Sequence, residues 1–299
     1  MFNKWKKNTV YISTMQIILL IVNFFLITII SRKYGAEIYG EYASAKSLSV
    51  LIGTVTVLSL ALVVTRTSAN MEEFNSSLFY TTYRVIIRNT FFAFALVIPL
   101  SNIFGRNFTY VFFFLLGFVF NEMLHVALAY HQSKGDFVIS SKQIIIRTVL
   151  YGLGGWTIVF LDYSIIWIIV FQAVILTLFF IVAHFSLPNT DRSSEGLHDK
   201  KELSSAGRKM VLTTFSAALL SELDIVILGI FYSGPILGVL AWSKRILEGL
   251  YQLVGASLDI VFPEVSKLSD FKIIADLRKK LRVVVTVSYT HLRAHETDT

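Results

Sequence analysis

Charged residues interrupt one long apolar stretch of the sequence, at 236–262. Lys244 and Arg245 are adjacent, and Glu248 follows four residues after Lys244, so Lys244 and Glu248 share one face of the expected helix. Polar positions at helical spacing continue along this face to Asp259. An ionised group in apolar surroundings is costly unless it has a partner or faces water. We therefore expect Lys244 and Arg245 to bind an anionic ligand in a cavity that Glu248 and Asp259 also line. The alternative is an internal ion pair that makes burial tolerable.

A further lysine, Lys46, lies in a second apolar stretch, at 42–65. Its helical face continues through Ser49, Gly53 and Thr56, which suits a polar cavity. At 1.5 Å per residue Lys46 is only about 6 Å inside this stretch. A lysine at that depth can also extend its side chain to the membrane surface. Both a role in anion binding and this surface role remain open for Lys46.

Acidic residues and a histidine mark two more apolar stretches. Glu122 and His125 are three residues apart within 109–131, so the two side chains can touch and form a proton site. The alternative is a polar contact between helices. Glu222 and Asp224 are two apart and point in different directions, so only one is expected to face a given cavity. Asp224 is the candidate, either for coupling or for helix packing.

The composition explains why these charges matter. Of 299 residues, 55% are hydrophobic and only 16% are charged, and the mean hydropathy is +0.65. Soluble domains carry about a quarter charged residues. Disorder is excluded by the hydrophobicity, and disulfides and thiolate metal sites by the absence of Cys. The sequence contains no Walker loop, Ser-His-Asp set or metal-ligand set, so we expect neither an enzyme nor a cofactor.

The apolar runs predict an all-α, polytopic membrane protein. A membrane helix needs about 20 mostly apolar residues, and the runs are too long and continuous for β-barrel strands. The eight predicted spans are 10–31, 42–65, 85–104, 109–131, 143–161, 165–187, 211–232 and 236–262. Twenty of the 27 Lys and Arg residues fall at the N-terminus, in the even-to-odd loops or within the first five residues of the spans that follow these loops, and only Arg32, Lys33 and Arg106 fall in the opposite loops. This asymmetry places the N-terminus in the cytoplasm. It also accounts for most of the +7 net charge, so nucleic-acid binding is not expected.

The chain divides into four segments on this interpretation. Residues 1–187 form a six-helix lobe, 188–210 a cytoplasmic linker, and 211–286 the start of a second lobe. An offset of 198 aligns Tyr34–Lys46 with Tyr232–Lys244 and makes five of thirteen positions identical, which indicates an internal repeat. Residues 287–299 have neither a membrane nor an amphipathic pattern. We interpret them as a translated sequencing adapter and expect the native second lobe to continue with further spans.

Two motifs carry a family resemblance. The first is the turn Ser31–Tyr42, and the second combines Asp224–Phe231 with the turn Ser233–Gly238, Ala241–Arg245 and Pro263–Ser266. Together they resemble bacterial Wzx-type O-antigen flippases of the multidrug/oligosaccharidyl-lipid/polysaccharide exporter superfamily. The resemblance covers residues 1 to about 286. It implies two lobes in the bacterial cytoplasmic (inner) membrane, with an undecaprenyl-diphosphate glycan as substrate. Membrane lipid and a polysaccharide polymerase are the further partners implied.

The favoured function is therefore translocation of a lipid-linked oligosaccharide for surface polysaccharide biosynthesis. An exporter of small cationic drugs from the same superfamily is the nearest alternative, but it would need a net acidic cavity. A membrane-embedded glycan polymerase or ligase would need large outer loops, whereas the predicted outer loops have about ten residues or fewer. A scaffold without transport would not require charged residues along its spans.

Overall fold

A computed structural model describes residues 2–69, 76–188, 200–232 and 234–249. All of them belong to one structural unit, Met1–Gln252. Seven helices are α1 (Phe2–Val57), α2 (Leu60–Ala69), α3 (Ser76–Ile103), α4 (Phe108–Ser133), α5 (Phe137–Phe160), α6 (Ile166–Phe185) and α7 (Lys200–Phe231). A further helix begins at 235 and is described to 249. No strand occurs in these ranges, and six helices within them are long and apolar enough to cross a membrane. The prediction of an all-α polytopic membrane protein is confirmed.

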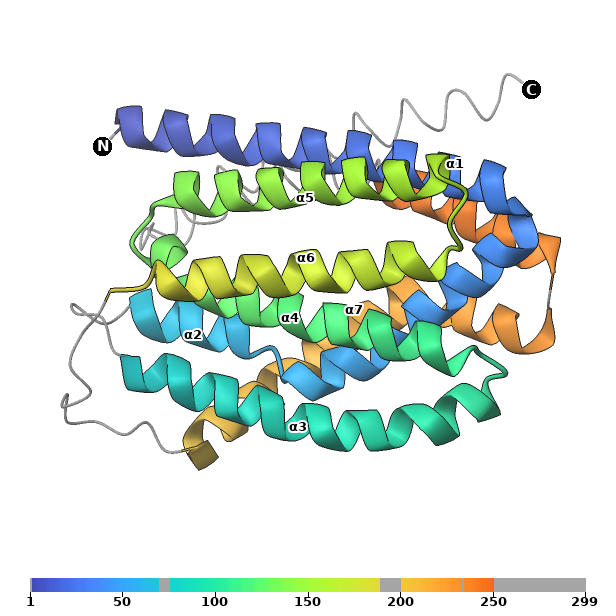
Figure 1. Cartoon of the computed structure of the whole chain (residues 1–299). Coiled ribbons are helices and arrows are strands. Elements are labelled where there is room, and N and C mark those ends of the chain that lie inside the picture. Colours follow the sequence, from blue (N-terminus) through green and yellow to red (C-terminus); the bar gives the residue numbers. More distant parts are fainter. Residues whose placement is uncertain (1, 70–75, 189–199, 233, 250–299) are drawn as a thin grey trace, which may run out of the picture. The chain divides into compact units, whose positions relative to one another are not determined.

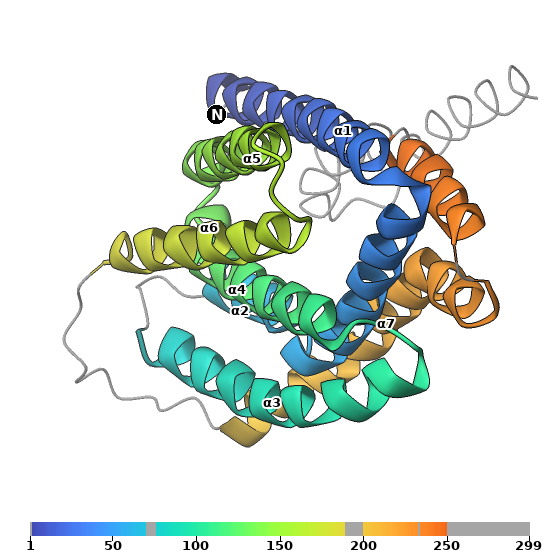
Figure 2. The ribbon, with the colours of Figure 1, turned by 45° about the vertical axis from the view of Figure 1, so that its right-hand side comes forward.

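Helix α1 contains two of the predicted spans. Gly35 lies in the left-handed region, with φ 82° and ψ 164°, and separates an N-terminal half from a second half that turns away from it (Figure 2). Such a conformation suits a residue without Cβ. The second half therefore begins at Ala36, and Lys46 lies about 15 Å along it at 1.5 Å per residue. The sequence pattern predicted a distance of about 6 Å from the helix start. That distance was too short, because the pattern showed where the apolar run starts and not where the helix starts.

The second predicted span is broken near its C-terminal end. Leu58 and Ser59 both have positive φ, 52° and 53°, and separate α1 from α2. Few residues other than glycine adopt this conformation. The Ser59 hydroxyl lies 2.5 Å from the hydroxyl of Thr214 on α7, and Gly207 on α7 packs against the Leu58 carbonyl. The break is thus held by contacts with α7, which the sequence of the span does not show.

Two other helices begin earlier than predicted. Helix α3 starts at Ser76, nine residues before the predicted span, and α7 starts at Lys200, within the predicted linker at 188–210. A hydropathy pattern detects only the apolar part of a helix, whereas polar turns can extend beyond it. The adapter assigned to 287–299 and the continuation after 249 lie outside the described residues.

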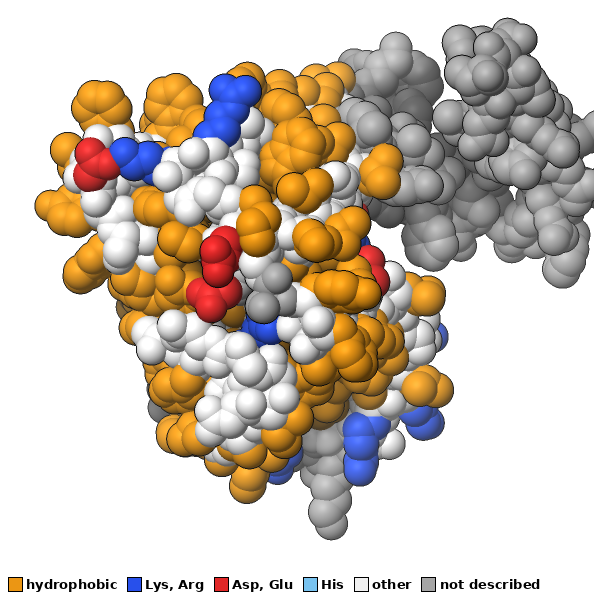
Figure 3. All heavy atoms as spheres, turned by 90° about the vertical axis from the view of Figure 1, so that its right-hand side faces the viewer, with side chains coloured by type: hydrophobic (Ala, Val, Ile, Leu, Met, Phe, Trp, Pro, Cys, Tyr) orange, Lys and Arg blue, Asp and Glu red, His pale blue; other side chains and the backbone are white. Residues whose placement is uncertain are grey.

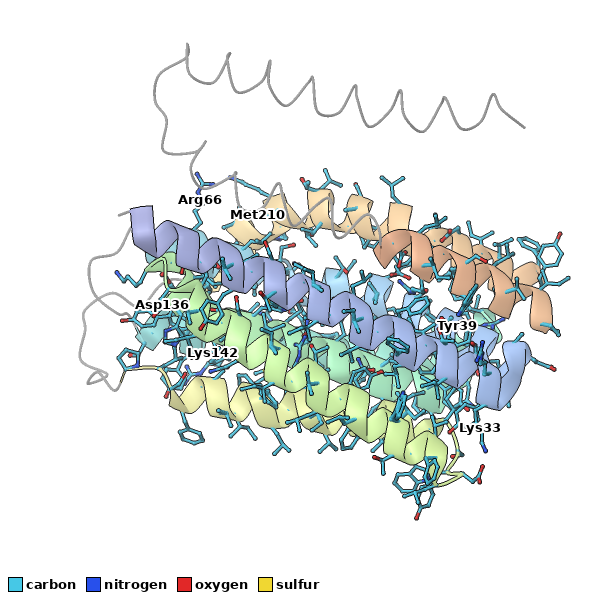
Figure 4. The ribbon with its side chains drawn as sticks, turned by 90° about the horizontal axis from the view of Figure 1, so that it is seen from above. Lys33, Tyr39, Arg66, Asp136, Lys142 and Met210 are labelled. Atoms are coloured by element: carbon cyan, nitrogen blue, oxygen red, sulfur yellow. The ribbon has the colours of Figure 1, made fainter. Side chains whose placement is uncertain are left out.

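Successive helices run back and forth between two ends (Figure 1). Figure 4 shows Arg66, Asp136, Lys142 and Met210 near one end, which we call the basic end, and Lys33 and Tyr39 near the opposite end. The Gly35 bend and the α3–α4, α5–α6 and post-α7 turns also lie at the opposite end. The loops that the sequence shows to be rich in Lys and Arg therefore lie at one end of the structure, and the loops poor in Lys and Arg lie at the other.

Helix α4 forms the centre of the packing. It contacts α1, α2, α3, α5 and α6, and its Val111, Leu115 and Val126 are completely buried. Large apolar side chains on the outer faces are instead exposed: Phe91 by 73%, Phe160 by 86% and Leu220 by 87%. Hydrophobic side chains also dominate the sides of the molecule when it is viewed from the opposite end (Figure 3). Such a surface suits lipid contact.

Candidate functional site: two adjoining cavities beside a charged cluster

A cluster of paired charges joins α7, the helix at 235–249 and the second half of α1. Arg245 donates hydrogen bonds to Glu222 at 2.9 and 3.2 Å, and to Glu248 at 2.6 Å. The Ser47 hydroxyl donates to Glu222 Oε2, which also accepts from Arg245 Nη2, with 2.5 Å between the two oxygens. Only 8% of the Glu222 side chain and 15% of the Arg245 side chain are exposed. Glu222 is therefore the buried acceptor that connects three helical segments.

A second pair lies beside the first but nearer the surface. Lys244 forms an ion pair with Asp224, whose side chain is 53% exposed, and its Nζ lies 3.9 Å from a Glu248 oxygen. Glu222 and Asp224 do point apart, as their spacing predicted. However, each meets one of the two adjacent cations, and Glu222 is the one that belongs to the buried network.

These pairs remove the expected excess of positive charge at Lys244 and Arg245. The sequence-based count gave those two cations only Glu248 as a partner, whereas α7 supplies two more carboxylates. Lys46 is different, because it forms no ion pair with any described residue within 4 Å. Lys46 is therefore the cation of the predicted substrate-binding set that has no ion pair among the described residues, although Glu222 and Glu248 lie close enough for their charges to act on it.

Cavity 1 has a volume of about 240 Å³. Both halves of α1 line it, together with α4, α5 and α6. Its polar lining residues are Asn23, Lys46, Ser49, Asn121, Arg147, Thr148, Tyr151 and Gln172. Arg147 donates to the Asn121 side-chain oxygen at 2.5 Å. Among the described lining residues there are two cations and no Asp or Glu, so the cavity suits an anion.

Cavity 2 adjoins cavity 1 and has a volume of about 380 Å³. Lys46 and Asn23 line both cavities. The rest of cavity 2 is mostly apolar, formed by the N-terminal half of α1 and by Trp242 and Ile246 of the helix at 235–249, with Arg245 and Glu248 as its other charged residues. The two cavities thus place a polar chamber next to an apolar one, with Lys46 between them.

The other predicted site residues have different surroundings. Glu122 is next to Asn121 in the chain, and His125 lies close enough to Arg147 to be influenced by its charge. Neither Glu122 nor His125 lines cavity 1 or cavity 2, and no direct bond between them is present in the described structure. Lys244 and Asp224 also line neither cavity. Asp259 lies outside the described residues.

Sequence reasoning missed Arg147 and Glu222 as site residues. Arg147 was counted with the loop cations, but α5 begins at Phe137 and places Arg147 about 15 Å along the helix at 1.5 Å per residue. Its spacing of four residues from Tyr151, on one helical face, is the signal that could have revealed it. Glu222 had no such signal, because its partners come from distant segments.

The groups that line the two cavities can bind polar, anionic and apolar parts of a ligand. The described residues contain no group of three or more His, Asp or Glu residues that could hold a metal ion. Charged and amide groups at the cavities can neutralise phosphates and hydrogen-bond to sugars, and the apolar wall can hold hydrocarbon.

Comparison with known proteins identifies the family. Residues 58–290, more than three quarters of the chain, match the family described as "Polysaccharide biosynthesis protein". No curated protein and no solved structure shows a significant match. The match includes α2 to α7 and the helix at 235–249, which together carry every charged residue of the two cavities except Lys46. The chain therefore belongs to the polysaccharide biosynthesis protein family.

Proposed function

We propose that this protein moves a lipid-linked oligosaccharide, an undecaprenyl-diphosphate glycan, across the bacterial cytoplasmic membrane. The observation that carries the proposal is the junction of a cationic polar cavity with an apolar one at Lys46. The substrate has the same division, since an anionic diphosphate joins a polar glycan to a hydrocarbon chain. Membership of a polysaccharide biosynthesis family supports this substrate class.

Cavity 1 is the proposed site for the diphosphate and the sugar next to it. An unneutralised phosphate in apolar surroundings is strongly unfavourable. Lys46 supplies a compact charge, and Arg147 supplies a planar guanidinium that can donate two hydrogen bonds to one phosphate. The amides of Asn23, Asn121 and Gln172 can then bind sugar hydroxyls.

Cavity 2 is the proposed site for the first part of the lipid chain. Phe24, Phe25 and Ile27 of α1 face Trp242 and Ile246 across it. The apolar lining favours hydrocarbon, and its charged residues are close to the shared Lys46 boundary. Lipid bound there would keep the diphosphate beside Lys46.

The proposed orientation places the basic end in the cytoplasm and the Lys33 end outside, following the excess of Lys and Arg. The bound head group would then be exposed to each side in turn as the two lobes move around the cavities. An exporter of small cations fits less well, because cavity 1 has no carboxylate among its described lining residues.

The test is neutralisation of the two cavity cations in the complete native protein. Lys46→Gln and Arg147→Gln should each reduce surface glycan in a strain lacking its own flippase, and the double variant should abolish it. Lipid-linked oligosaccharide should accumulate on the inner side. Arg147→Lys should retain more activity than Arg147→Gln, because attraction to a phosphate depends mainly on charge.

Lys142→Gln is the matched control, since Lys142 is an exposed cation on the same helix, five residues before Arg147. It should leave surface glycan unchanged. Membrane levels of every variant are measured in parallel to exclude poor insertion. Normal surface glycan from a well-expressed Lys46→Gln, Arg147→Gln variant would refute the proposal.

A further inference from the structure

Arg106 is one of three cations in the turns at the opposite end, and it joins three segments there. Its Nε donates to the Phe104 carbonyl of its own turn at 2.8 Å, and its Nη1 donates to the Ser44 hydroxyl of α1, also at 2.8 Å. Its Nη2 donates to the Gly229 carbonyl of α7. One guanidinium therefore ties the α3–α4 turn and the second half of α1 to the last turns of α7.

The local sequence allows this contact. A Cβ on Gly229 would lie 3.4 Å from both the Arg106 Cζ and the Ser44 Cβ, so the guanidinium fits closely over a residue without a side chain. Burial lowers the pKa of Arg106, and the charge of the nearby Glu41 carboxylate opposes that shift. Arginine remains protonated in proteins under such conditions. The contact to α7 is thus a charge-assisted hydrogen bond, which is stronger than a neutral one.

A second contact closes the same end. Gly238, at the start of the helix at 235–249, packs so tightly against Ala36 that an added Cβ would overlap the Ala36 carbonyl. The Phe104 and Gly229 carbonyls and Gly238 lie within a few residues of helix ends, whereas Ser44 lies farther along α1, two residues before Lys46 of the cavities. Segments of the first lobe are therefore joined at this end to the two helices that follow the linker.

We propose that Arg106 is a latch that holds α7 against the first lobe at the outer end and releases when the cavities open outward. This inference rests on the proposed function, since only a transporter needs that end to open. The latch suits reversible opening, because water near the membrane surface can replace the carbonyl and hydroxyl acceptors. The planar guanidinium fixes the direction of its hydrogen bonds as well as supplying a charge. It therefore holds α7 in one specific arrangement.

A disulfide across the latch provides the test. The Cβ–Cβ separation for Ser44→Cys with Gly229→Cys would be 3.4 Å, close to the range of about 3.5–4.5 Å found in disulfides. The 299-residue sequence contains no Cys. In the complete native protein, with any other Cys replaced, an oxidant should therefore form this bridge efficiently. The bridge should stop glycan export, and a reductant should restore it.

Val22→Cys with Gly152→Cys is the matched control. These positions on α1 and α5 have a similar Cβ–Cβ separation of 3.7 Å, but both belong to the first lobe. This bridge should form without stopping export. Single-Cys variants treated with the same oxidant control for other effects of oxidation.

An accessibility measurement tests the latch without using glycan. Ser44 is 1% exposed, so Ser44→Cys should react slowly with an impermeant thiol reagent added from outside. Adding Arg106→Gln should raise that rate at least fivefold, and Arg106→Lys should raise it less. Unchanged reactivity, failure of the bridge to form, or full export by bridged protein would overturn the latch. Because this measurement does not use export, unchanged Ser44→Cys reactivity refutes the latch alone, whereas normal export by the cavity variants refutes the proposed function.

Discussion

Gly40 and Gly238, which occupy equivalent positions in the internal repeat, lie against one another. A Cβ on Gly40 would be 2.9 Å from the backbone nitrogen of Gly238. A twofold relation between two segments brings equivalent residues together on its axis. The close approach at both positions explains why they need glycine, whereas the repeat of Tyr34–Lys46 in Tyr232–Lys244 stays a prediction.

The first prediction concerns this contact. Gly238→Ala should destabilise the protein by about 1–3 kcal/mol, because an added methyl group would meet backbone that cannot move aside. The measurement is thermal stability of the purified protein in detergent. Val239→Ala, at an exposed neighbouring position, is the control and should have little effect. Equal stability of the Gly238→Ala and Val239→Ala variants would show that the contact at Gly238 has room for a methyl group.

The second prediction separates the two ion pairs. Glu222→Gln should cost up to roughly 3–5 kcal/mol of stability, because it removes one of the two carboxylates that pair with the buried Arg245 and leaves that charge with Glu248 alone. Asp224→Asn should cost about 1 kcal/mol or less, because Asp224 is half exposed. Thermal unfolding of both variants in the same detergent provides the comparison. A larger loss from Asp224→Asn would reverse the order inferred from burial.

The third prediction concerns orientation. Asn107→Cys and Tyr163→Cys lie in turns at the Lys33 end and are exposed, whereas Lys209→Cys is exposed near the basic end. An impermeant maleimide added to intact cells should label the first two and not the third. All three should react after the membrane is made permeable. Labelling of Lys209→Cys in intact cells would invert the proposed topology.

The fourth prediction concerns coupling. If Glu122 carries a coupling proton, Glu122→Gln should make glycan export independent of an imposed proton gradient, since an amide cannot ionise. Export into inverted vesicles, with and without the gradient, measures this dependence. His125→Gln tests whether the neighbouring histidine is also needed. Normal gradient dependence in Glu122→Gln would assign coupling to another residue.

The sequence by itself determined the membrane class, most spans and the separation of basic residues. Each depends on short-range information, because an apolar run of sufficient length must become a helix in lipid, where every backbone group needs a partner within the segment. The motifs also indicated the polysaccharide-related family, which the match over residues 58–290 confirms at that coarser level. Lys46 was identified for the same reason, as a charge inside an apolar run.

Only the tertiary structure showed which of these cations have a carboxylate partner among the described residues. Lys244 and Arg245 looked unpaired along their own helix, but Asp224 and Glu222 reach them from α7. Arg147 looked like a loop residue until α5 placed it beside Asn121 in cavity 1. The bend at Gly35 and the break at Leu58–Ser59 also set how deep Lys46 lies and how α7 docks. Pairing and depth depend on neighbours that are distant in sequence, so helical periodicity alone cannot supply them.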